Sequence, residues 1–442
     1  MARLFGTDGV RGVAGTELTP ELARGLGRAA VVVLGRHGAG HPKLVVGRDT
    51  RESGEWLEDA LTEGIREAGG DVVLAGVEPT PAVAFMTVDL GASSGVVISA
   101  SHNPAEDNGI KFFARDGMKL PDRLEDEIEA ELARPTAPAS RRGTILPVGD
   151  GRERYARHLE SAADARLDGM SVVIDCANGA ASEVAPTILE RLGARVHAIN
   201  ATPDGRNINQ GAGALHPEVV AAEVVRRGAD AGVSHDGDAD RALFADAGGA
   251  VIDGDQVLAA SAIAMKERGT LAGNVVVATV MSNLGLSIAL RNAGIELVRT
   301  AVGDRFVLEE MERRGATLGG EQSGHVIFRE HATTGDGLLT AVRFLSLAAA
   351  KGKPVHELAA AMQRLPQVIV NVRVADRDGL ADASGVAEAV AAAEASLGDD
   401  GRVLVRSSGT EPLIRVMVEA GTEERARAYA GAIADAVRSS LG

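Results

Sequence analysis

The sequence predicts an α/β protein, with three tandem α/β domains of helix-covered mixed sheets followed by a smaller C-terminal α+β domain. Two observations lead to this fold class. One pattern occurs three times in the 442 residues: an apolar β-branched strand, a polar or Gly-rich loop, an amphipathic helix, a glycine and a second strand. Such a unit covers a sheet with helices. The residues after 366 show an alternating strand instead, which is typical of a sheet with one exposed face.

The first occurrence of the pattern starts at Lys43–Gly47, whose residues KLVVG favour a buried strand. A helix over Glu55–Ala68 follows, and the second strand is expected at Val72–Leu74. Gly69 lies between them and suits the left-handed conformation that ends many helices. The segment therefore predicts the first α/β unit.

The second and third occurrences keep the same order of elements. They start at the strands Ser171–Asp175 and Asn274–Thr279. The helices, closing glycines and second strands are, in order, Glu183–Leu192, Gly193 and Arg195–Ile199, then Leu284–Asn292, Gly294 and Glu296–Arg299. The starts lie 128 and 103 residues apart, which is too far for a solenoid repeat. We therefore expect separate domains.

The C-terminal part is expected to be a small antiparallel sheet with helices. Its elements are expected at the strand Gln367–Val374, the helix Val386–Ala395, the strands Gly401–Arg406 and Leu413–Glu419, and the helix Glu423–Ser439. A Pro- and Ala-rich connector at Arg134–Arg142 indicates the first domain boundary. The expected domains are residues 1–150, 151–252, 253–365 and 366–442.

Composition limits the classes of function. The net charge is −16, from 62 acidic and 46 basic residues, so no basic surplus is available for nucleic acid. The single cysteine, Cys176, excludes an intrachain disulfide and suits a reducing cytosol, and its apolar neighbours predict a small buried residue. The N-terminus shows no signal peptide, and no apolar run approaches the roughly 18 residues of a membrane span. We therefore expect a cytoplasmic protein without a membrane or nucleic-acid partner.

The stretch Gly95–Phe113 carries the first chemical motif. A short apolar strand breaks into the irregular loop Ser99–Pro104, and a second strand follows. Ser101 lies at the tip of this loop, with His102 beside it and Lys111 ten residues further on. Loops that leave the end of a buried strand often carry the chemistry of α/β proteins. Serine is also an ordinary turn residue, so this motif decides nothing by itself.

The segment Ser234–Arg241, SHDGDADR, carries three aspartates between two expected strands. Asp236, Asp238 and Asp240 alternate with small residues, so an extended loop would turn all three carboxylates to one side. Clustered carboxylates repel one another, and a divalent cation relieves this. An EF-hand is excluded because the sixth and twelfth positions are not Gly and Glu. The oxygen ligands favour Mg²⁺ over a charged hairpin tip without metal.

A third motif is Gly319–His325, GGEQSGH. Glu321 and Ser323 lie two residues apart, so an extended loop would present both to one ligand. Glu accepts hydrogen bonds from sugar hydroxyls, and Ser donates or accepts them. His325 has a suitable pKa for proton transfer. Without the other motifs, this segment reads as a Gly-rich turn.

Two further motifs lie near the ends of the chain. Arg406–Arg415, RSSGTEPLIR, offers hydroxyls and backbone N–H groups that can wrap an oxyanion, with an arginine at each end for phosphate. Phe5–Gly12, FGTDGVRG, is a Gly-rich segment with Arg11. Each of these is weak evidence by itself, since a lone arginine in a turn is usually only solvated.

Taken together, the five motifs resemble the α-D-phosphohexomutase superfamily, and most closely its bacterial phosphoglucosamine branch. They occur along the full length and in order: FGTDGVRG, ISASHNP, DGDADR, GEQSGH and RSSGTEPLIR. Gln322 and the opening FGTDGVRG point to that branch. The sequence departs from the family pattern at Ala239, where glycine is common, and at Ser407, a variable position. Neither departure removes a functional side chain.

The resemblance implies a role for each motif. Ser101 would be the phosphoserine, and its phosphate with Asp236, Asp238 and Asp240 would bind one Mg²⁺ per chain. Arg11, Lys111 and His325 would line the transfer site, and Arg241 would help to position the phosphate. The implied substrate-binding residues are Glu321 and Ser323 for the sugar hydroxyls, and Arg406, Ser408, Gly409, Thr410 and Arg415 for the non-reacting phosphate.

The resemblance also implies the reaction. Glucosamine 6-phosphate would be converted to glucosamine 1-phosphate through glucosamine 1,6-bisphosphate, an activating intermediate, for UDP-N-acetylglucosamine and the cell wall. The expected partner is a small sugar phosphate, and the chain would act as a monomer or homodimer. For the proton acceptor, Lys111 and His325 are preferred to His102.

Two alternative activities stay open at the sequence level. One is a phosphomannomutase or phosphoglucomutase of the same superfamily. The other is an aspartyl-phosphate phosphatase with Asp236 as nucleophile. A sugar-phosphate sensor without activity is disfavoured because Ser101 and all three aspartates are present. Acyl transfer is unsupported, because no Ser-His-Asp set is evident.

Overall fold

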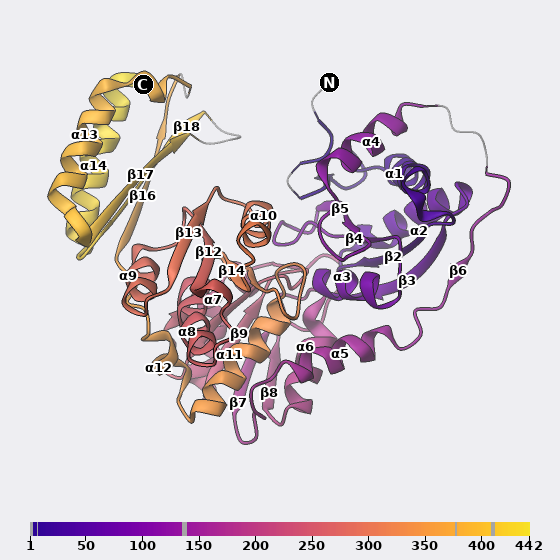
Figure 1. The fold of residues 1–442 in the computed structure, drawn as a ribbon, viewed down its shortest axis with the longest axis horizontal. Coiled ribbons are helices and arrows are strands. Elements are labelled where there is room, and N and C mark those ends of the chain that lie inside the picture. The colour runs from indigo at the N-terminus through magenta and orange to yellow at the C-terminus, as the bar shows by residue number, and fades with distance from the viewer. Residues whose placement is uncertain (1–2, 7, 135–138, 376–377, 408–411) are drawn as a thin grey trace. The chain divides into compact units, whose positions relative to one another are not determined.

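The computed structural model describes the whole chain except residues 1–2, 7, 135–138, 376–377 and 408–411. The chain forms two compact units. One contains Met1–Val280 and Ile295–Ala360, and the other contains Met281–Gly294 and Ala361–Gly442. Over the described residues, the first unit holds three mixed sheets and the second holds one antiparallel sheet (Figure 1). This confirms the predicted fold class.

The first sheet has the strand order β1-β5-β4-β2-β3-β6. Its strands are β1 (Val10–Val13), β2 (Lys43–Arg48), β3 (Asp71–Val77), β4 (Ser94–Ile98), β5 (Asp107–Ala114) and β6 (Ile145–Leu146). Its helices are α1 (Pro20–Leu34), α2 (Glu52–Glu67), α3 (Thr80–Asp89) and α4 (Asp122–Leu132). β2, β3, β4 and β6 are parallel, whereas β5 is antiparallel to β4.

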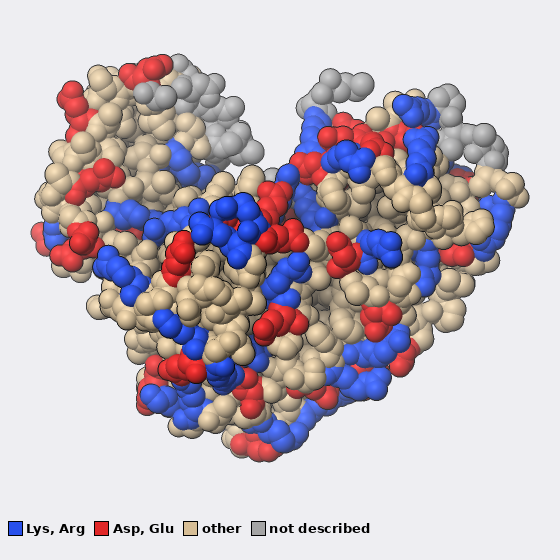
Figure 2. All heavy atoms as spheres, in the orientation of Figure 1, with Lys and Arg blue, Asp and Glu red and all other residues tan. Residues whose placement is uncertain are grey.

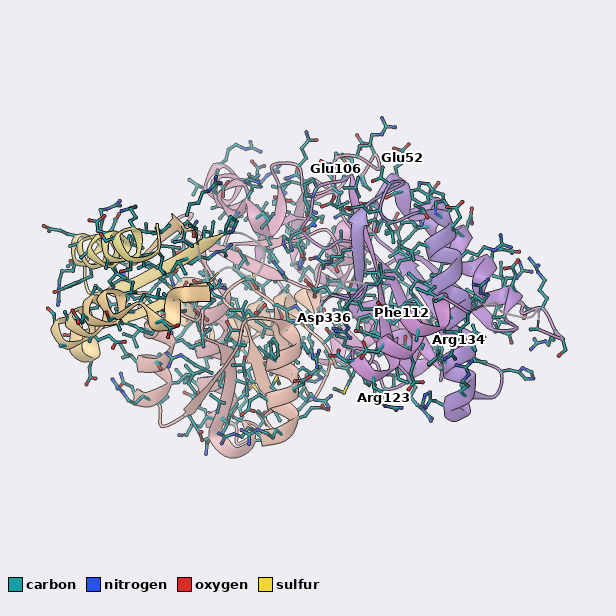
Figure 3. The ribbon with its side chains drawn as sticks, turned by 90° about the horizontal axis from the view of Figure 1, so that it is seen from above. Glu52, Glu106, Phe112, Arg123, Arg134 and Asp336 are labelled. Carbon is teal, nitrogen blue, oxygen red and sulfur yellow. The ribbon has the colours of Figure 1, made fainter. Side chains whose placement is uncertain are left out.

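Helices cover both faces of this sheet. On one face, α1 and α2 bury a cluster that includes Leu26, Leu57 and Phe112, the last labelled in Figure 3. The two helices approach so closely that a Cβ atom on Gly64 would collide with the Arg24 carbonyl. On the other face, α3 lies against β2 and β4. The sheet is thus covered on both sides, as its apolar strands predict.

The second sheet has the order β11-β10-β9-β7-β8. Its strands are β7 (Ser171–Asp175), β8 (Arg195–Ile199), β9 (Ala231–His235), β10 (Ala242–Asp246) and β11 (Val251–Ile252). The helices that accompany it are α5 (Gly151–Ser161), α6 (Ala181–Arg191) and α7 (Pro217–Arg227). β7, β8 and β9 are parallel, and β10 is antiparallel to β9.

The third sheet has the order β13-β12-β14-β15. Its strands are β12 (Val275–Thr279), β13 (Glu296–Thr300), β14 (Leu318–Gly320) and β15 (Val326–Phe328). Its helices are α8 (Gly254–Glu267), α10 (Asp304–Arg314), α11 (Gly337–Lys351) and α12 (Val355–Ala359). Phe244 of β10 packs against Phe344 of α11 with ring centroids 4.7 Å apart, so α11 joins the second sheet to the third.

The second unit has the antiparallel sheet β16-β18-β17. Its elements are α9 (Leu284–Asn292), β16 (Gln367–Arg373), α13 (Ser384–Leu397), β17 (Gly401–Ser407), β18 (Leu413–Ala420) and α14 (Glu423–Leu441). The Glu419 carboxylate is fully buried and accepts hydrogen bonds from the Leu284 N–H and the Asn283 amide. This contact ties the start of α9 to the C-terminal sheet.

Several local predictions are confirmed. Gly69, Gly193 and Gly294 have φ values of 88°, 99° and 66°, as expected for glycines that end helices. Cys176 is fully buried, and burial raises the pKa of its thiol above the usual range. No helix in the described part of the chain is long and apolar enough to cross a bilayer. Acidic and basic side chains are interspersed over the face seen in Figure 2.

In each of the four sheets, a predicted motif lies between a strand and the antiparallel strand that follows it in the chain. The Ser101 loop joins β4 to the antiparallel β5, and the aspartate loop joins β9 to the antiparallel β10. The Glu321 loop joins β14 to β15 in the same way, and the C-terminal motif begins in β17 and ends in its antiparallel partner β18. In the three mixed sheets, each motif follows the carboxyl end of a strand with a parallel neighbour, where α/β folds place ligands.

Candidate active site

Ser101 lies in a buried, constrained turn. Its side chain is only 4% exposed, and its φ of 50° is left-handed, which is uncommon for a residue other than glycine. The hydroxyl Oγ donates a 2.7 Å hydrogen bond to Oδ2 of Asp236. The first and second sheets thereby bring the predicted phosphoserine next to the aspartate loop.

Asp236, Asp238 and Asp240 converge so that one oxygen of each lies within 4.8 Å of the others. The loop is not extended, which corrects the expected geometry. The Ala239 N–H donates to the Asp236 carbonyl, and Ala239 has a φ of 56°, so a tight turn brings the carboxylates together. A left-handed position explains why a small residue stands where glycine is common.

The electrostatics of this cluster fit a divalent cation. Burial and the neighbouring carboxylates raise the pKa of Asp236 to about 6 and that of Asp238 well above its ordinary value. Burial also opposes the ionisation of Asp240, but His325 and Arg241 outweigh it and lower the pKa of that carboxyl. Within the described residues, Oδ1 of each aspartate is buried without a hydrogen-bond partner. Three clustered carboxylates that keep buried, unpartnered oxygens are suitable ligands for Mg²⁺.

Basic side chains lie around the same pocket. The Arg241 Nε atom lies 3.8 Å from Asp236 Oδ2 and 3.7 Å from Asp240 Oδ1. Lys111 forms a 3.4 Å ion pair with Asp304. Burial opposes the charge of Lys111, but Asp304 and other carboxylates raise its pKa, so it is an ammonium group at neutral pH.

His325 is buried behind Asp240, with Nδ1 3.3 Å from Asp240 Oδ2. Burial lowers its pKa, but Asp240, Asp304 and Glu321 outweigh this and raise the pKa to about 9. The Gly335 N–H, in contrast, donates to Nε2, which requires a lone pair that the imidazolium lacks. The hydrogen bond therefore favours the neutral ring with its proton on Nδ1. In neither form does a ring nitrogen remain to take a proton from a substrate.

His102 lies closer to the serine than sequence reasoning expected. Its Nδ1 is 3.3 Å from Ser101 Oγ. Burial, together with the charges of Arg241 and Arg11, lowers its pKa to about 4, so the ring is neutral at physiological pH. Of the three histidine and lysine candidates for proton transfer, only His102 is within 3.5 Å of Ser101 Oγ in a neutral form.

The Glu321 loop is also a turn and not an extended segment, because the Gly324 N–H donates to the Glu321 carbonyl. Glu321 lines the pocket and accepts a hydrogen bond from the Gly303 N–H. Ser323 does not line it. Gln322 donates to the Asp253 carboxylate at the start of α8, so its side chain anchors the loop.

The pocket has a volume of about 260 Å³ and lies wholly within the first unit. The polar side chains that line it are Asp8, Arg11, Thr80, Ser99, Ser101, Lys111, Asp238, Asp240, Arg241, Asp304, Glu321 and His325. Sequence reasoning missed Asp8, Thr80, Ser99 and Asp304. Thr80 donates a 2.6 Å hydrogen bond to Asp238 Oδ2, and Asp304 pairs with Lys111. Asp304 could have been found from the sequence, because it follows Gly303 at the start of a helix.

The C-terminal motif belongs to the second unit. Arg406 and Arg415 are cross-strand neighbours in the β17–β18 pair, and burial with the charge of Arg415 lowers the pKa of Arg406. Ser408, Gly409 and Thr410 lie outside the described residues. The two arginines therefore occupy one end of the hairpin whose loop carries the predicted phosphate-binding motif.

Comparisons with known proteins agree with this geometry. Four models of phosphoglucomutase/phosphomannomutase domains match the chain: α/β/α domain I at residues 2–138, domain II at 153–249, domain III at 253–365 and the C-terminal domain at 369–436. The phosphoglucosamine mutase of Frankia casuarinae is 56% identical, over 100% of this chain and 99% of its own length. That of Rhodococcus opacus is 55% identical, over 99% and 100%.

The chain belongs to the phosphoglucosamine mutase family of the α-D-phosphohexomutases. Solved structures show the same fold for the superfamily. A phosphoglucomutase/phosphomannomutase family protein from Burkholderia thailandensis has a TM-score of 0.84 at 26% identity, covering 99% of this chain and 97% of its own. The N-acetylphosphoglucosamine mutase of Aspergillus fumigatus, solved with GlcNAc-6P and magnesium, has a TM-score of 0.70 at 18% identity, covering 99% and 95%.

Proposed function

We propose that the protein is a phosphoglucosamine mutase that interconverts glucosamine 6-phosphate and glucosamine 1-phosphate through phosphorylated Ser101. The observation that carries this assignment is the contact between Ser101 Oγ and Asp236 at 2.7 Å, beside two further buried aspartates. A phosphorylated serine in this place is a phosphoryl donor that needs positioning and charge neutralisation. Family membership supports the same reaction.

In the first half-reaction, the O1 hydroxyl of glucosamine 6-phosphate attacks the phosphorus on Ser101. The new O1–P bond forms as the P–Oγ bond breaks, the O1 proton leaves, and a proton ends on Ser101 Oγ. Lys111, Arg241 and Arg11 line the pocket and supply positive charge for the transferring group. His102 Nδ1 lies near enough to Oγ to exchange a proton with it. The product is glucosamine 1,6-bisphosphate.

In the second half-reaction, the bisphosphate presents its 6-phosphate to Ser101, which takes that group back and leaves glucosamine 1-phosphate. The non-reacting phosphate then needs its own holder. We assign this role to the 406–415 motif, with Arg406, Ser408, Gly409, Thr410 and Arg415, and the sugar hydroxyls to Glu321 and Ser323. The paired arginines and the pocket position of Glu321 support these assignments.

One Mg²⁺ fits the three aspartates, and Asp236, Asp238 and Asp240 would hold it together with the Ser101 phosphate. When bound, it would neutralise charge on the transferring phosphoryl group. Thr80 orients Asp238, and Arg241 pairs with Asp236 and Asp240. These contacts hold the three carboxylates in one cluster, whose Asp236 accepts the Ser101 hydroxyl.

The charge of the pocket favours an amino sugar. Besides the metal-facing aspartates, the carboxylates of Asp8, Asp304 and Glu321 line it. A 2-ammonium group gains from carboxylates in a buried pocket, whereas a 2-hydroxyl gains less. This favours glucosamine phosphate over mannose or glucose phosphate. We place the reaction in the cytoplasm, before UDP-N-acetylglucosamine synthesis, with the enzyme a monomer or homodimer.

An aspartyl-phosphate phosphatase fits the structure less well. Asp236, its nucleophile, is 1% exposed, does not line the pocket, and accepts the Ser101 hydroxyl. An attacking carboxylate must reach the substrate phosphorus, and this one faces the serine.

Turnover of glucosamine, mannose and glucose 6-phosphates, each with a catalytic amount of its own 1,6-bisphosphate, tests the assignment. We expect the highest kcat/KM for glucosamine 6-phosphate by at least about tenfold, which corresponds to roughly 1.4 kcal/mol of transition-state binding. A clear preference for mannose or glucose 6-phosphate would move the protein to the other branch of the superfamily.

A further inference from the structure

Arg51 lies beneath the Ser101 loop, at the residue before α2, and its side chain is completely buried. Its guanidinium donates to backbone carbonyls of the loop: Nη2 to Ser101 at 3.0 Å and to Asn103 at 2.8 Å, and Nη1 to Asp107 at 2.9 Å and to Pro104. One planar group thus holds four carbonyls between Ser101 in the loop and Asp107 at the start of β5.

Asp49 completes this arrangement from the end of β2. Its Oδ2 accepts the Arg51 Nε–H at 2.9 Å and the Ser99 hydroxyl at 2.6 Å. The Ser99 hydroxyl in turn accepts the Ser101 N–H at 2.9 Å. Arg51 therefore holds the Ser101 carbonyl directly. The Ser101 N–H is held by the Ser99 hydroxyl, which is itself bonded to the Asp49 carboxylate that pairs with Arg51.

A second donor comes from the segment that precedes the α7 region. The Asn209 amide donates to the Ser101 carbonyl at 2.9 Å and to the Asn103 carbonyl at 3.0 Å. Both acceptors are also acceptors of Arg51. The loop is thus fixed from the first domain by Arg51 and from the second by Asn209.

A buried ion pair does not by itself stabilise a fold, because desolvation offsets the attraction between its charges. Hydrogen bonds to four convergent carbonyls, in contrast, fix a backbone that would otherwise leave the uncommon left-handed region at Ser101. The direction of the Ser101 Cα–Cβ bond, and with it the direction of Oγ toward Asp236, depends on that backbone conformation.

We propose that Arg51, oriented by Asp49, is the positioning residue that sets the direction of the Ser101 side chain for phosphoryl transfer. This inference rests on the proposed function, since it treats Ser101 as the phosphoryl carrier. Arg51 does not touch the pocket. It acts through the loop carbonyls, so a change at Arg51 should alter the rate of transfer and leave the affinity for the sugar phosphate nearly unchanged.

The test compares Arg51→Lys with a matched control, Arg66→Lys. Arg66 lies in α2 and also donates to a loop carbonyl, that of Gly143 at 3.1 Å, but takes no part in the Ser101 loop. Lysine keeps the positive charge in both variants but replaces the planar fork with one nitrogen. For each protein, one measures the single-turnover rate at which phosphorylated Ser101 passes its phosphate to an accepted sugar phosphate, the KM, and the thermal midpoint.

We expect Arg51→Lys to remain folded, to slow the transfer at least tenfold and to change KM less than threefold, whereas Arg66→Lys transfers within twofold of the wild type. Asn209→Ala, which keeps Arg51, should give an intermediate loss. If Arg51→Lys is folded and transfers phosphate within twofold of the wild type, or if the loss lies in KM, the proposal is wrong. If Arg51→Lys does not fold, Asp49→Asn and Asn209→Ala decide by the same rate criterion.

Failure of the proposed function gives a different result. A wild-type protein that transfers the Ser101 phosphate to mannose or glucose 6-phosphate, but not to glucosamine 6-phosphate, overturns the substrate assignment, and the Arg51 comparison is made with the accepted sugar. A wild-type protein that never carries phosphate on Ser101 overturns both.

Discussion

At the scale of single residues, the site depends on a serine that is held in an unusual backbone conformation next to three carboxylates. Ser101 has a φ of 50°, and Ala239 in the facing loop has a φ of 56°. Each left-handed residue has a cost on the order of 1 kcal/mol, which the surrounding hydrogen bonds offset. Strain of this kind is commonly found where a side chain must point at a reacting group.

Ser101→Ala should lose nearly all activity, by at least about 1,000-fold, because the proposed reaction passes the phosphoryl group through this hydroxyl, which is bonded to Asp236. The protein should stay folded, since the change removes one hydroxyl. A coupled assay for glucosamine 1-phosphate, with circular dichroism as the folding check, measures both. Full activity in this variant would end the phosphoserine mechanism.

Asp238→Asn should raise the thermal midpoint of the metal-free protein and reduce the further shift that Mg²⁺ produces. Without metal, the substitution removes the cost of burying a charge and the repulsion from the neighbouring carboxylates, which together raise the pKa of Asp238, so the thermal midpoint should rise. The shift produced by added Mg²⁺ should shrink, because one ligand is lost; for the wild type the stabilisation reaches about 2.7 kcal/mol at a hundredfold excess over Kd. Thermal unfolding with EDTA and with Mg²⁺ measures both effects.

Asp246→Asn is the matched control, since Asp246 ends β10 outside the cluster and accepts turn N–H groups that an amide oxygen can also bind. Its Mg²⁺ shift should equal that of the wild type. An undiminished shift in Asp238→Asn would show that the three aspartates are not the metal site.

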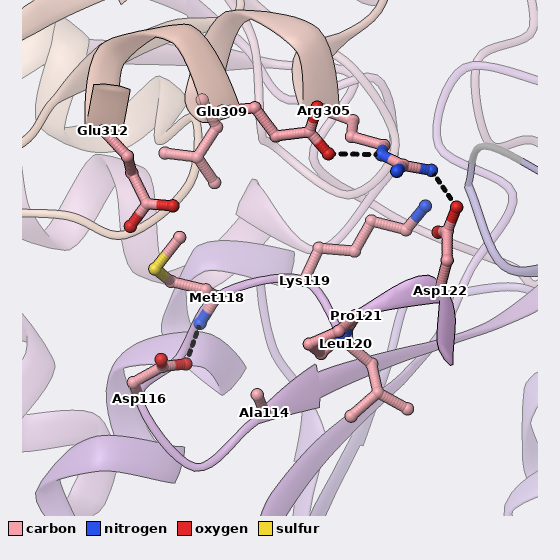
Figure 4. A pocket seen from close by; sticks show the side chains of 11 residues that line it. Ala114, Asp116, Met118, Lys119, Leu120, Pro121, Asp122, Arg305, Glu309 and Glu312 are labelled. Carbon is pink, nitrogen blue, oxygen red and sulfur yellow. Dashed lines mark hydrogen bonds and ion pairs between the residues drawn. The ribbon is translucent and has the colours of Figure 1, made fainter. Parts of the chain in front are cut away.

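At the scale of elements, the start of α10 is joined to the first domain by two consecutive residues. Asp304 pairs with Lys111 of β5. Arg305 pairs with Asp122 at the start of α4, as Figure 4 shows. Arg305 also bonds Glu309 within α10. This junction lines a second cavity of about 320 Å³. Because Lys111 faces the candidate active site, the junction connects that site to α10.

The Arg305–Asp122 pair should contribute about 0.2–1 kcal/mol, because both side chains are about a third exposed and solvent screens the attraction. A double-mutant cycle of Arg305→Ala and Asp122→Ala, by urea unfolding, measures this coupling. It should decrease as salt increases. The control is Glu309→Ala, which breaks only the bond within α10 and should leave kcat unchanged. A coupling that is zero at low salt would contradict the assigned junction.

Asp336, at the start of α11 and labelled in Figure 3, makes stability depend on pH. Burial raises its pKa to about 6, although hydrogen bonds from Leu339 and Tyr155 act in the other direction. The folded state therefore keeps a proton that the unfolded state loses near pH 4. This contribution to stability is present below pH 4 and is lost as the pH rises to about 6.

The loss amounts to about 3 kcal/mol for a shift of about two pKa units. Asp336→Asn keeps the shape of the side chain without the charge. Relative to the wild type, the variant should become more stable between pH 4 and pH 7, as measured by chemical unfolding at several pH values. The exposed Asp399→Asn is the control and should show no such trend. A difference between Asp336→Asn and the wild type that does not change with pH would refute the role of this carboxyl.

Sequence patterns predicted the strands that carry the motifs well, because a buried strand shows its apolar residues locally. β7, β8 and α9 have the expected bounds. The long helix α1 was not predicted, although Thr19 as N-cap and Pro20 at the first helical position are the usual signals of a helix start. Arg51 was missed for a different reason: its four acceptors are carbonyls some fifty residues away, which no side-chain motif records.

At the scale of the whole molecule, the chain has two units, and each carries part of the predicted substrate site. The pocket with Ser101 and the aspartates is in the first unit, and the Arg406–Arg415 hairpin is in the second. The sequence predicted the separate C-terminal sheet because its strands alternate and pair in order. It predicted the convergence of the aspartates but not the turn at Ala239 that produces it, since a left-handed alanine has no sequence signal.

The most direct test of the account is the mass of the intact protein, followed by peptide mapping of its phosphorylated form. We predict that the protein carries one phosphate on Ser101, that this phosphate is lost on incubation with excess glucosamine 6-phosphate, and that it returns with glucosamine 1,6-bisphosphate. Phosphate on Asp236, or a Ser101 that stays unmodified in the presence of the bisphosphate, would contradict the central claim.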